Sequence, residues 1–224
     1  MCGIAGVLGP EGSVATTGAL LAMAGELRHR GPDGTGVYLD GRLGMANTRL
    51  AVLDLAGGDQ PIGSEDGRHW VVQNGEIYNH AELRAELAAK GHVFATRSDT
   101  EVLVHAYEEW GEAMLPRLNG EFAFAIWDRR TGALFLARDR FGVRPLFVAE
   151  AGGALAFASE AKALLRHGLV GRALDPLGLV EACALWSTAP DRSAFAGVRE
   201  LAPGSWLRLE RDGRRTERRW WQLT

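Results

Sequence analysis

The sequence contains very little cysteine and very little lysine, and both shortages narrow the classes of protein that it can encode. Only Cys2 and Cys183 occur among 224 residues, too few for a disulfide framework, which indicates a reducing compartment. Lys90 and Lys162 are the only lysines, so almost all of the basic charge is arginine, and the formal net charge is -3. No stretch gathers basic residues on one face, so nothing points to a nucleic-acid partner.

Long apolar runs are also missing. No run approaches the roughly 20 residues that a membrane-spanning helix needs. Residues 1–5 lack the basic and apolar regions of a signal peptide. Arginines do cluster at residues 211–219, but acidic residues alternate with them, which predicts a solvated pair of strands. We therefore predict a cytoplasmic protein that binds neither a membrane nor nucleic acid.

Apolar periodicity and turn residues predict a chain of strands and helices without internal repeats. The predicted helices are 19–27, 81–89, 101–110, 160–165 and 176–185. The predicted strands are 3–8, 37–39, 43–53, 70–73, 122–127, 133–137, 146–149, 155–158, 205–209 and 216–221. Asp99 and Thr100 precede one helix and offer it a side-chain cap. Strands, then helices, then more strands predict an α+β fold of two packed sheets with outer helices, in one domain.

Cysteine at position 2, followed by Gly3, is the most informative local feature. Removal of Met1 would leave Cys2 with a free α-amino group, whose reference pKa of about 7.7–8.0 lies close to the thiol's value of about 8.5. One residue would then supply both a nucleophile and a base of matched acidity. The same position also suits a small buried hydrophobic residue, so Cys2 alone does not establish catalysis.

Further segments follow in order along nearly the whole chain. They are residues 1–7 (MCGIAGV), 28–33 (RHRGPD), 48–54 (TRLAVLD), 74–80 (NGEIYNH), 98–102 (SDTEV), 120–128 (GEFAFAIWD), 138–146 (RDRFGVRPL) and 158–164 (ASEAKAL). Together they resemble class II glutamine amidotransferases. Two late segments, 201–205 (LAPGS) and 219–223 (RWWQL), resemble most the glutaminase domain of glutamine-hydrolysing asparagine synthetases.

The resemblance implies a fold and a catalytic mechanism. The fold would be the four-layer αββα sandwich of N-terminal nucleophile hydrolases. Cys2 would attack the side-chain amide of glutamine and form a thioester, and ammonia would be released. The side-chain amide of Asn74 and the N–H of Gly75 would form the oxyanion hole. By itself, the Asn74-Gly75 pair favours a type I′ hairpin turn; within the resemblance, the oxyanion hole is the favoured interpretation.

The resemblance also implies how glutamine would be bound. Arg49 would bind the carboxylate and Asp99 the ammonium group, because a zwitterion needs one partner of each sign. The remaining lining residues would be Leu50, Leu53, Asn74, Gly75 and Glu76. The loop at residues 30–33 resembles a segment that closes over the substrate, and its proline and glycine suit a lid. Cys183 has no counterpart in the family, which predicts a core residue.

One motif of asparagine synthetases does not occur in these 224 residues. Their second domain carries a Ser-Gly-Gly-x-Asp pyrophosphate loop for ATP, and no such motif is found. We therefore expect no cofactor and no metal in this chain, and assign ATP and Mg²⁺ to an absent synthetase domain. The chain would be part of a longer protein, or a stand-alone glutaminase with a synthetase partner in trans. Whether it forms a homodimer is left open by the sequence. Glu121 stands where the resemblance leads us to expect Met.

Two alternatives remain open. The chain could be the glutaminase of another amidotransferase that supplies ammonia to a sugar-phosphate or other biosynthetic acceptor. It could also be a non-catalytic scaffold of the same fold. The scaffold is disfavoured because the expected site residues are all present: Cys2, Arg49, Asn74, Gly75 and Asp99.

Overall fold

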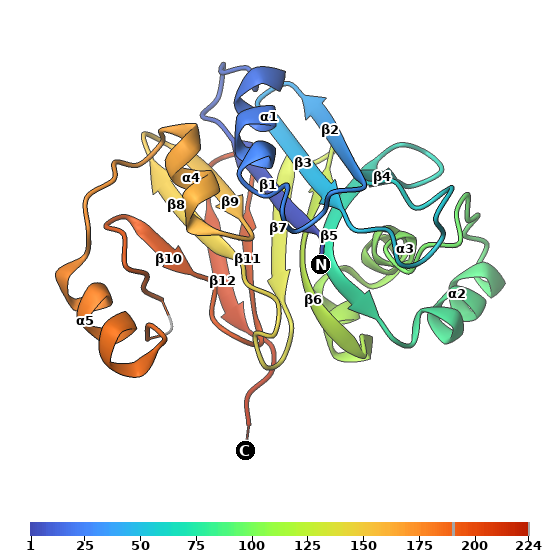
Figure 1. Cartoon of the computed structure of the whole chain (residues 1–224). Helices are drawn as coiled ribbons and strands as arrows, with labels where there is room; N and C mark the ends of the chain where they lie inside the picture. The colour runs from blue at the N-terminus through green and yellow to red at the C-terminus, as the bar shows by residue number, and fades with distance from the viewer. Residues whose placement is uncertain (190, 224) are drawn as a thin grey trace.

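The computed structural model describes residues 1–189 and 191–223, and two antiparallel sheets form its centre (Figure 1). The strands are β1 (Gly3–Leu8), β2 (Gly34–Asp40), β3 (Leu43–Arg49), β4 (Ile62–Gly63), β5 (His69–Ile77), β6 (Gly120–Asp128), β7 (Ala133–Arg138), β8 (Phe147–Ala151), β9 (Ala154–Ala158), β10 (Val198–Glu200), β11 (Ser205–Leu209) and β12 (Arg215–Arg219). The first sheet has the order β10-β8-β9-β1-β3-β2. The second has the order β12-β11-β7-β6-β5-β4.

Helices cover the outer faces of the two sheets. They are α1 (Thr17–Gly25), α2 (His80–Ala89), α3 (Glu101–Trp110), the 3-10 helix η1 (Gly111–Arg117), α4 (Ala161–His167) and α5 (Pro176–Leu185). Figure 1 shows α1 and α4 over the first sheet, α2 and α3 beside the second, and α5 at one edge of the molecule. Within residues 1–189 and 191–223, no helix is both long and apolar enough to cross a membrane.

Buried apolar side chains fall into three layers, which define how sheets and helices stack. The middle layer lies between the two sheets and includes Ile4 and Leu136. A second layer, with Ala5 and Leu20, joins the first sheet to α1 and α4. The third layer, with Phe124, joins the second sheet to α2 and α3. Adjacent residues of a strand enter different layers because side chains alternate. This stacking confirms the predicted α+β fold of four layers.

The prediction that Cys183 is a core residue was wrong. Cys183 is exposed on α5, and Gly178 is the buried residue of that helix. A Cβ atom at Gly178 would lie 2.0 Å from the Ser193 carbonyl oxygen, so the helix backbone presses against the chain there. The contact at Gly178 buries only that part of α5, and apolar residues of the helix such as Leu177 and Val180 remain exposed.

Two further local predictions were wrong, and one alternative is excluded. The strand that begins at Leu43 ends at Arg49 rather than at residue 53, because the following loop folds around the Arg49 guanidinium. The Asn74-Gly75 pair forms no turn; it lies within β5 and pairs with β6. Thr100 makes no side-chain capping hydrogen bond to α3, and the Asp99 carboxylate accepts the N–H of a β5 residue instead.

Candidate active site

Cys2 lies immediately before β1, at the end of the first sheet. Gly3 pairs with Thr48 of β3, and the same register places Cys2 beside Arg49. The Leu50 N–H donates to the Cys2 Sγ at 3.4 Å, and the thiol lies 3.7 Å from the Leu50 carbonyl oxygen. Burial raises the pKa of the Cys2 thiol, although the Leu50 N–H, the N-terminal ammonium and Arg49 oppose that rise. The thiol is therefore protonated at neutral pH and needs a base to become nucleophilic.

Asn74 belongs to the second sheet, and its side chain faces the sheet that carries Cys2. It shares a face of β5 with Val72, which packs in the layer between the sheets. The start of the chain lies beside β5 (Figure 1), and β1 contacts β5. The Asn74 side chain is fully buried, and neither of its polar atoms has a hydrogen-bond partner among the described residues. Such burial costs about 1–3 kcal/mol, and the Asn74 amide remains able to donate a hydrogen bond to a ligand.

The peptide N–H of Gly75 points toward the open edge of the same strand. Gly75 pairs with Phe122, whose N–H and carbonyl are both bonded to Asp139 on the other side. Gly75 is therefore in a non-hydrogen-bonded pair, and its peptide groups face away from β6. The N–H groups two positions before and after it donate to the side chains of Gln60 and Asp99. Between them, the Gly75 N–H has no acceptor within the described part of the chain.

Two carboxylates flank this edge. Asp99 is only 4% exposed, and its Oδ2 accepts the Ile77 N–H at 2.8 Å. Glu76 shares the face of Asn74, and burial together with the nearby charge of Asp99 raises the pKa of Glu76 to about 7. Burial also raises the pKa of Asp99, against the opposing effect of the Ile77 N–H. Two close, desolvated acids would be stabilised by a cation beside them.

Arg49 is buried, and its guanidinium is already engaged by the loop that follows. Nη1 donates to Asp59 Oδ1 at 2.7 Å and to the Leu55 carbonyl at 3.2 Å. Nη2 donates to the Leu53 carbonyl at 3.1 Å and to the Asp54 carbonyl at 2.6 Å. The carbonyls are held by the backbone, whereas the Asp59 side chain is 81% exposed and is able to rotate away. Leu53 thus contacts the Arg49 side chain, while Leu50 contacts the thiol.

The loop at residues 30–33 lies against the site. Arg30 Nε donates to the Cys2 carbonyl at 3.1 Å, and its Nη1 donates to Glu160 at 2.9 Å. Asp33 Oδ2 accepts the N–H of Ala51 at 2.8 Å. The loop is therefore tied both to the residue before β1 and to the chain that follows β3.

Sequence reasoning missed two residues of this region, Asp59 and Glu121. Glu121 is far in sequence from the predicted site residues and was given no role there, but the β5–β6 register places it opposite Glu76. There it pairs with Arg144, and the two act on the Glu76 pKa in opposite directions, Glu121 raising it and Arg144 lowering it. No local pattern could have revealed this, because the register between distant strands decides it. No local pattern marks Asp59 either, because it lies ten residues after Arg49 in the sequence and only the fold of the loop brings the two together.

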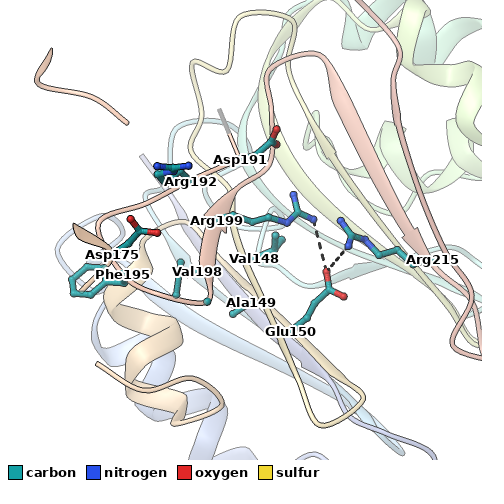
Figure 2. Close-up of a pocket in the computed structure, with 11 residues that line it drawn as sticks. Val148, Ala149, Glu150, Asp175, Asp191, Arg192, Phe195, Val198, Arg199 and Arg215 are labelled. Carbon is teal, nitrogen blue, oxygen red and sulfur yellow. Dashed lines mark ion pairs between the residues drawn. The ribbon is translucent and has the colours of Figure 1, made fainter. Parts of the chain in front are cut away.

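A cavity of about 460 Å³ lies elsewhere, near β8, β10 and the chain before β10 (Figure 2). None of the predicted site residues lines it. Arg199 and Arg215 both point to Glu150, at 3.8 and 3.2 Å, so these charges compensate one another. Because none of the predicted site residues lines this cavity, the site around Cys2 is the better candidate for catalysis.

The two-sheet fold and the cysteine before its first strand are those of a known class of amidotransferase domain. A sequence model of the family described as "Glutamine amidotransferase domain" matches residues 1–221, and the chain belongs to this family, of class II. It is 40% identical over 224 residues to asparagine synthetase (glutamine-hydrolyzing) 3 of Bacillus subtilis (strain 168), covering 98% of this chain and 36% of that protein. It is 45% identical over 166 residues to asparagine synthetase (glutamine-hydrolyzing) 2 of Oryza sativa subsp. japonica, covering 73% and 28%.

The chain thus spans about a third of the length of these relatives. Among solved structures, it is similar to the glutamine phosphoribosylpyrophosphate amidotransferase of B. subtilis, complexed with ADP and GMP. The TM-score is 0.71 at 22% identity, and the match covers 99% of this chain and 50% of that one. At this identity the likeness establishes the fold alone.

Proposed function

We propose that this chain hydrolyses the side-chain amide of L-glutamine to glutamate and ammonia through a thioester on Cys2. One observation carries the proposal: the start of the chain, which holds Cys2, lies beside the strand with two donors that have no partner among the described residues, the buried Asn74 amide and the Gly75 N–H. A thiol and a pair of preorganised donors are what acyl transfer from an amide requires. Membership of the glutamine amidotransferase family supports glutamine as the amide.

The chemistry follows from the residues at the site. With Met1 removed, the α-amine of Cys2 accepts the thiol proton while Sγ attacks the amide carbon. Asn74 Nδ2 and the Gly75 N–H donate to the resulting oxyanion. The amine then protonates the departing nitrogen, the C–N bond breaks, and ammonia leaves a glutamyl thioester on Cys2. Water attacks the thioester, again with the amine as base, and releases glutamate and the free thiol.

The charged groups around this centre fit the two ends of glutamine. Asp99 and Glu76 would bind the ammonium group, which would relieve the repulsion that raises the pKa of Glu76. The glutamine carboxylate would take the position that Asp59 occupies on Arg49 Nη1. Asp59 in this arrangement imitates the substrate carboxylate and competes with it.

We further propose that residues 1–224 act as one glutaminase domain that supplies ammonia to an ATP-dependent synthetase domain, in cis or in trans, which converts L-aspartate to L-asparagine. The relatives of about 40% identity are named asparagine synthetases, which favours this acceptor over a sugar phosphate. ATP and Mg²⁺ would be needed only there. The glutaminase reaction itself should proceed without them.

The experiment measures glutamate release by the purified chain and determines the intact mass of the same protein. The mature protein should begin at Cys2, and 6-diazo-5-oxonorleucine should label it there. Cys2→Ala, or an uncleavable extension before Cys2, should abolish glutamate release, whereas Cys183→Ala should not, because that thiol is exposed on α5. Full activity with the extension would refute the amine as base, and full activity of Cys2→Ala would refute the proposal and favour a scaffold.

A further inference from the structure

A group of potential metal ligands lies outside the site around Cys2, on the side of the second sheet covered by helices. Glu65 comes from the loop between β4 and β5, His92 from the chain after α2, and His105 and Glu108 from α3. One ligand atom from each of these four side chains lies within 4.8 Å of the others. His105 is fully buried, yet neither of its ring nitrogens makes a hydrogen bond within the described residues.

The spacing within this group suits a four-coordinate ion. Metal–ligand bonds of about 2.0–2.2 Å in a tetrahedron place neighbouring ligand atoms about 3.4 Å apart. His105 Nδ1 lies 3.3 Å from Glu65 Oε2, and His92 Nδ1 lies 3.6 Å from Glu108 Oε2. These two ligand pairs already have nearly that spacing. Glu65 is 37% exposed, so a rotation of its side chain is able to close the remaining gap.

The second nitrogen of each histidine faces a further carboxylate. His105 Nε2 lies 3.8 Å from Glu101 Oε1, and Glu101 is itself held by backbone N–H groups. His92 Nε2 lies 3.5 Å from Glu109 Oε2. A carboxylate behind a ligating histidine is the usual outer shell of a metal site, because it fixes the ring and raises the basicity of the ligating nitrogen.

Charge in the group points in the same direction. Three carboxylates, those of Glu65, Asp66 and Glu108, lie near the two histidines. A bound cation would relieve this crowding of carboxylates. A proton on His105 is the competing occupant, and it would join His105 to Glu65 and Glu101 as simple ion pairs.

We propose that Glu65, His92, His105 and Glu108 form a binding site for a divalent transition metal ion, with Zn²⁺ the best match. Two imidazole nitrogens and two carboxylate oxygens are ligands that Zn²⁺ accepts, and four protein ligands leave no open position, as in structural zinc sites. The ion would join three segments distant in sequence. One of them is α3, which begins two residues after Asp99. The metal would therefore stabilise the segment that carries Asp99.

The test uses the full chain, stripped with a chelator and with both thiols alkylated, so that Cys2 and Cys183 cannot bind the ion. Zn²⁺ and Co²⁺ are titrated calorimetrically, retained metal is measured after desalting, and thermal melts are recorded with and without Zn²⁺. The variants are His92→Gln and Glu108→Gln, both partly exposed, which spares the fully buried His105. His167→Gln is the matched control, because His167 lies on α4, over the other sheet.

We expect one Zn²⁺ per chain and a rise in the melting temperature on adding it. Each of His92→Gln and Glu108→Gln should weaken binding at least about tenfold and remove the rise, and His167→Gln should do neither. Equal binding by all four proteins would overturn the proposal, as would a wild-type chain that retains no zinc. In the latter case a proton occupies the group. Glutamine hydrolysis is not a readout here, so the result is independent of the proposed reaction.

Discussion

Replacing Asn74 with alanine should separate catalysis from folding. The Asn74 amide is buried between the sheets, and neither Nδ2 nor Oδ1 has a partner among the described residues. If the amide stabilises the oxyanion, its loss should lower kcat by about 100- to 1000-fold, or about 2.7–4 kcal/mol, as for other single oxyanion-hole donors. KM should change little, because the interaction is made in the transition state.

The stability of the same variant should not fall with its activity. An unpartnered buried amide costs about 1–3 kcal/mol, and its removal offsets the loss of packing in the small cavity that alanine leaves. We therefore expect the free energy of unfolding to stay within about 1 kcal/mol of wild type, or to rise. Urea unfolding and steady-state glutaminase kinetics on the same preparation provide the two measurements.

Gln73 provides a matched control for this experiment. It is the neighbouring residue of β5, it is equally buried, and its side-chain amide also lacks a partner within the described residues. Its side chain faces the helices rather than Cys2, because side chains alternate along the strand. Gln73→Leu should therefore keep its activity. The reasoning is refuted if Asn74→Ala retains wild-type kcat, or if both variants lose activity equally.

Three further outcomes follow from the site. Asp59→Asn should lower KM for glutamine by up to about fivefold with kcat unchanged, since an exposed ion pair is worth about 0–1 kcal/mol. A raised KM would show that Asp59 does not compete with the substrate. Gly75→Ala should abolish glutamine hydrolysis and lower the free energy of unfolding, measured in urea, by about 1–3 kcal/mol. The reason is that φ of Gly75 is +150° and that a Cβ there would lie 2.1 Å from the Glu121 carbonyl oxygen. Near-normal activity would contradict this geometry. Glu76 has a folded pKa of about 7 against an ordinary 4.5, so the folded protein holds a proton that the unfolded chain gives up, and stability declines as pH rises between these values. In Glu76→Gln that decline should shrink by roughly 1–2 kcal/mol, allowing for solvent screening. Thermal melts of both proteins at pH 5 and pH 8 provide the measurement. An equal change in melting temperature between the two pH values in wild type and variant would argue against the shifted pKa.

Local sequence pattern was sufficient to predict several of the regular elements within their observed bounds. The bounds predicted for β1 (Gly3–Leu8), α3 (Glu101–Trp110), α5 (Pro176–Leu185) and β11 (Ser205–Leu209) are confirmed. In these segments the apolar period, a turn or a proline at the first position specifies the structure within a few residues. The short strands β4 and β10 and the 3-10 helix η1 were missed, because two to seven residues are too few to establish a period.

The identity of the chain was likewise readable from the sequence, since its motifs run in order along nearly all of its length. The sequence did not predict which side chains contact one another. The pairing of β5 with β6 places Asn74 and Gly75 within a strand, which excludes the alternative of a turn, and it brings Glu121 opposite Glu76. The folding of a loop onto Arg49 placed Asp59 on the guanidinium that we propose as the partner of the substrate carboxylate. Periodicity is a property of neighbours along the chain, whereas register and loop closure depend on contacts between residues far apart, and only the tertiary structure decides those.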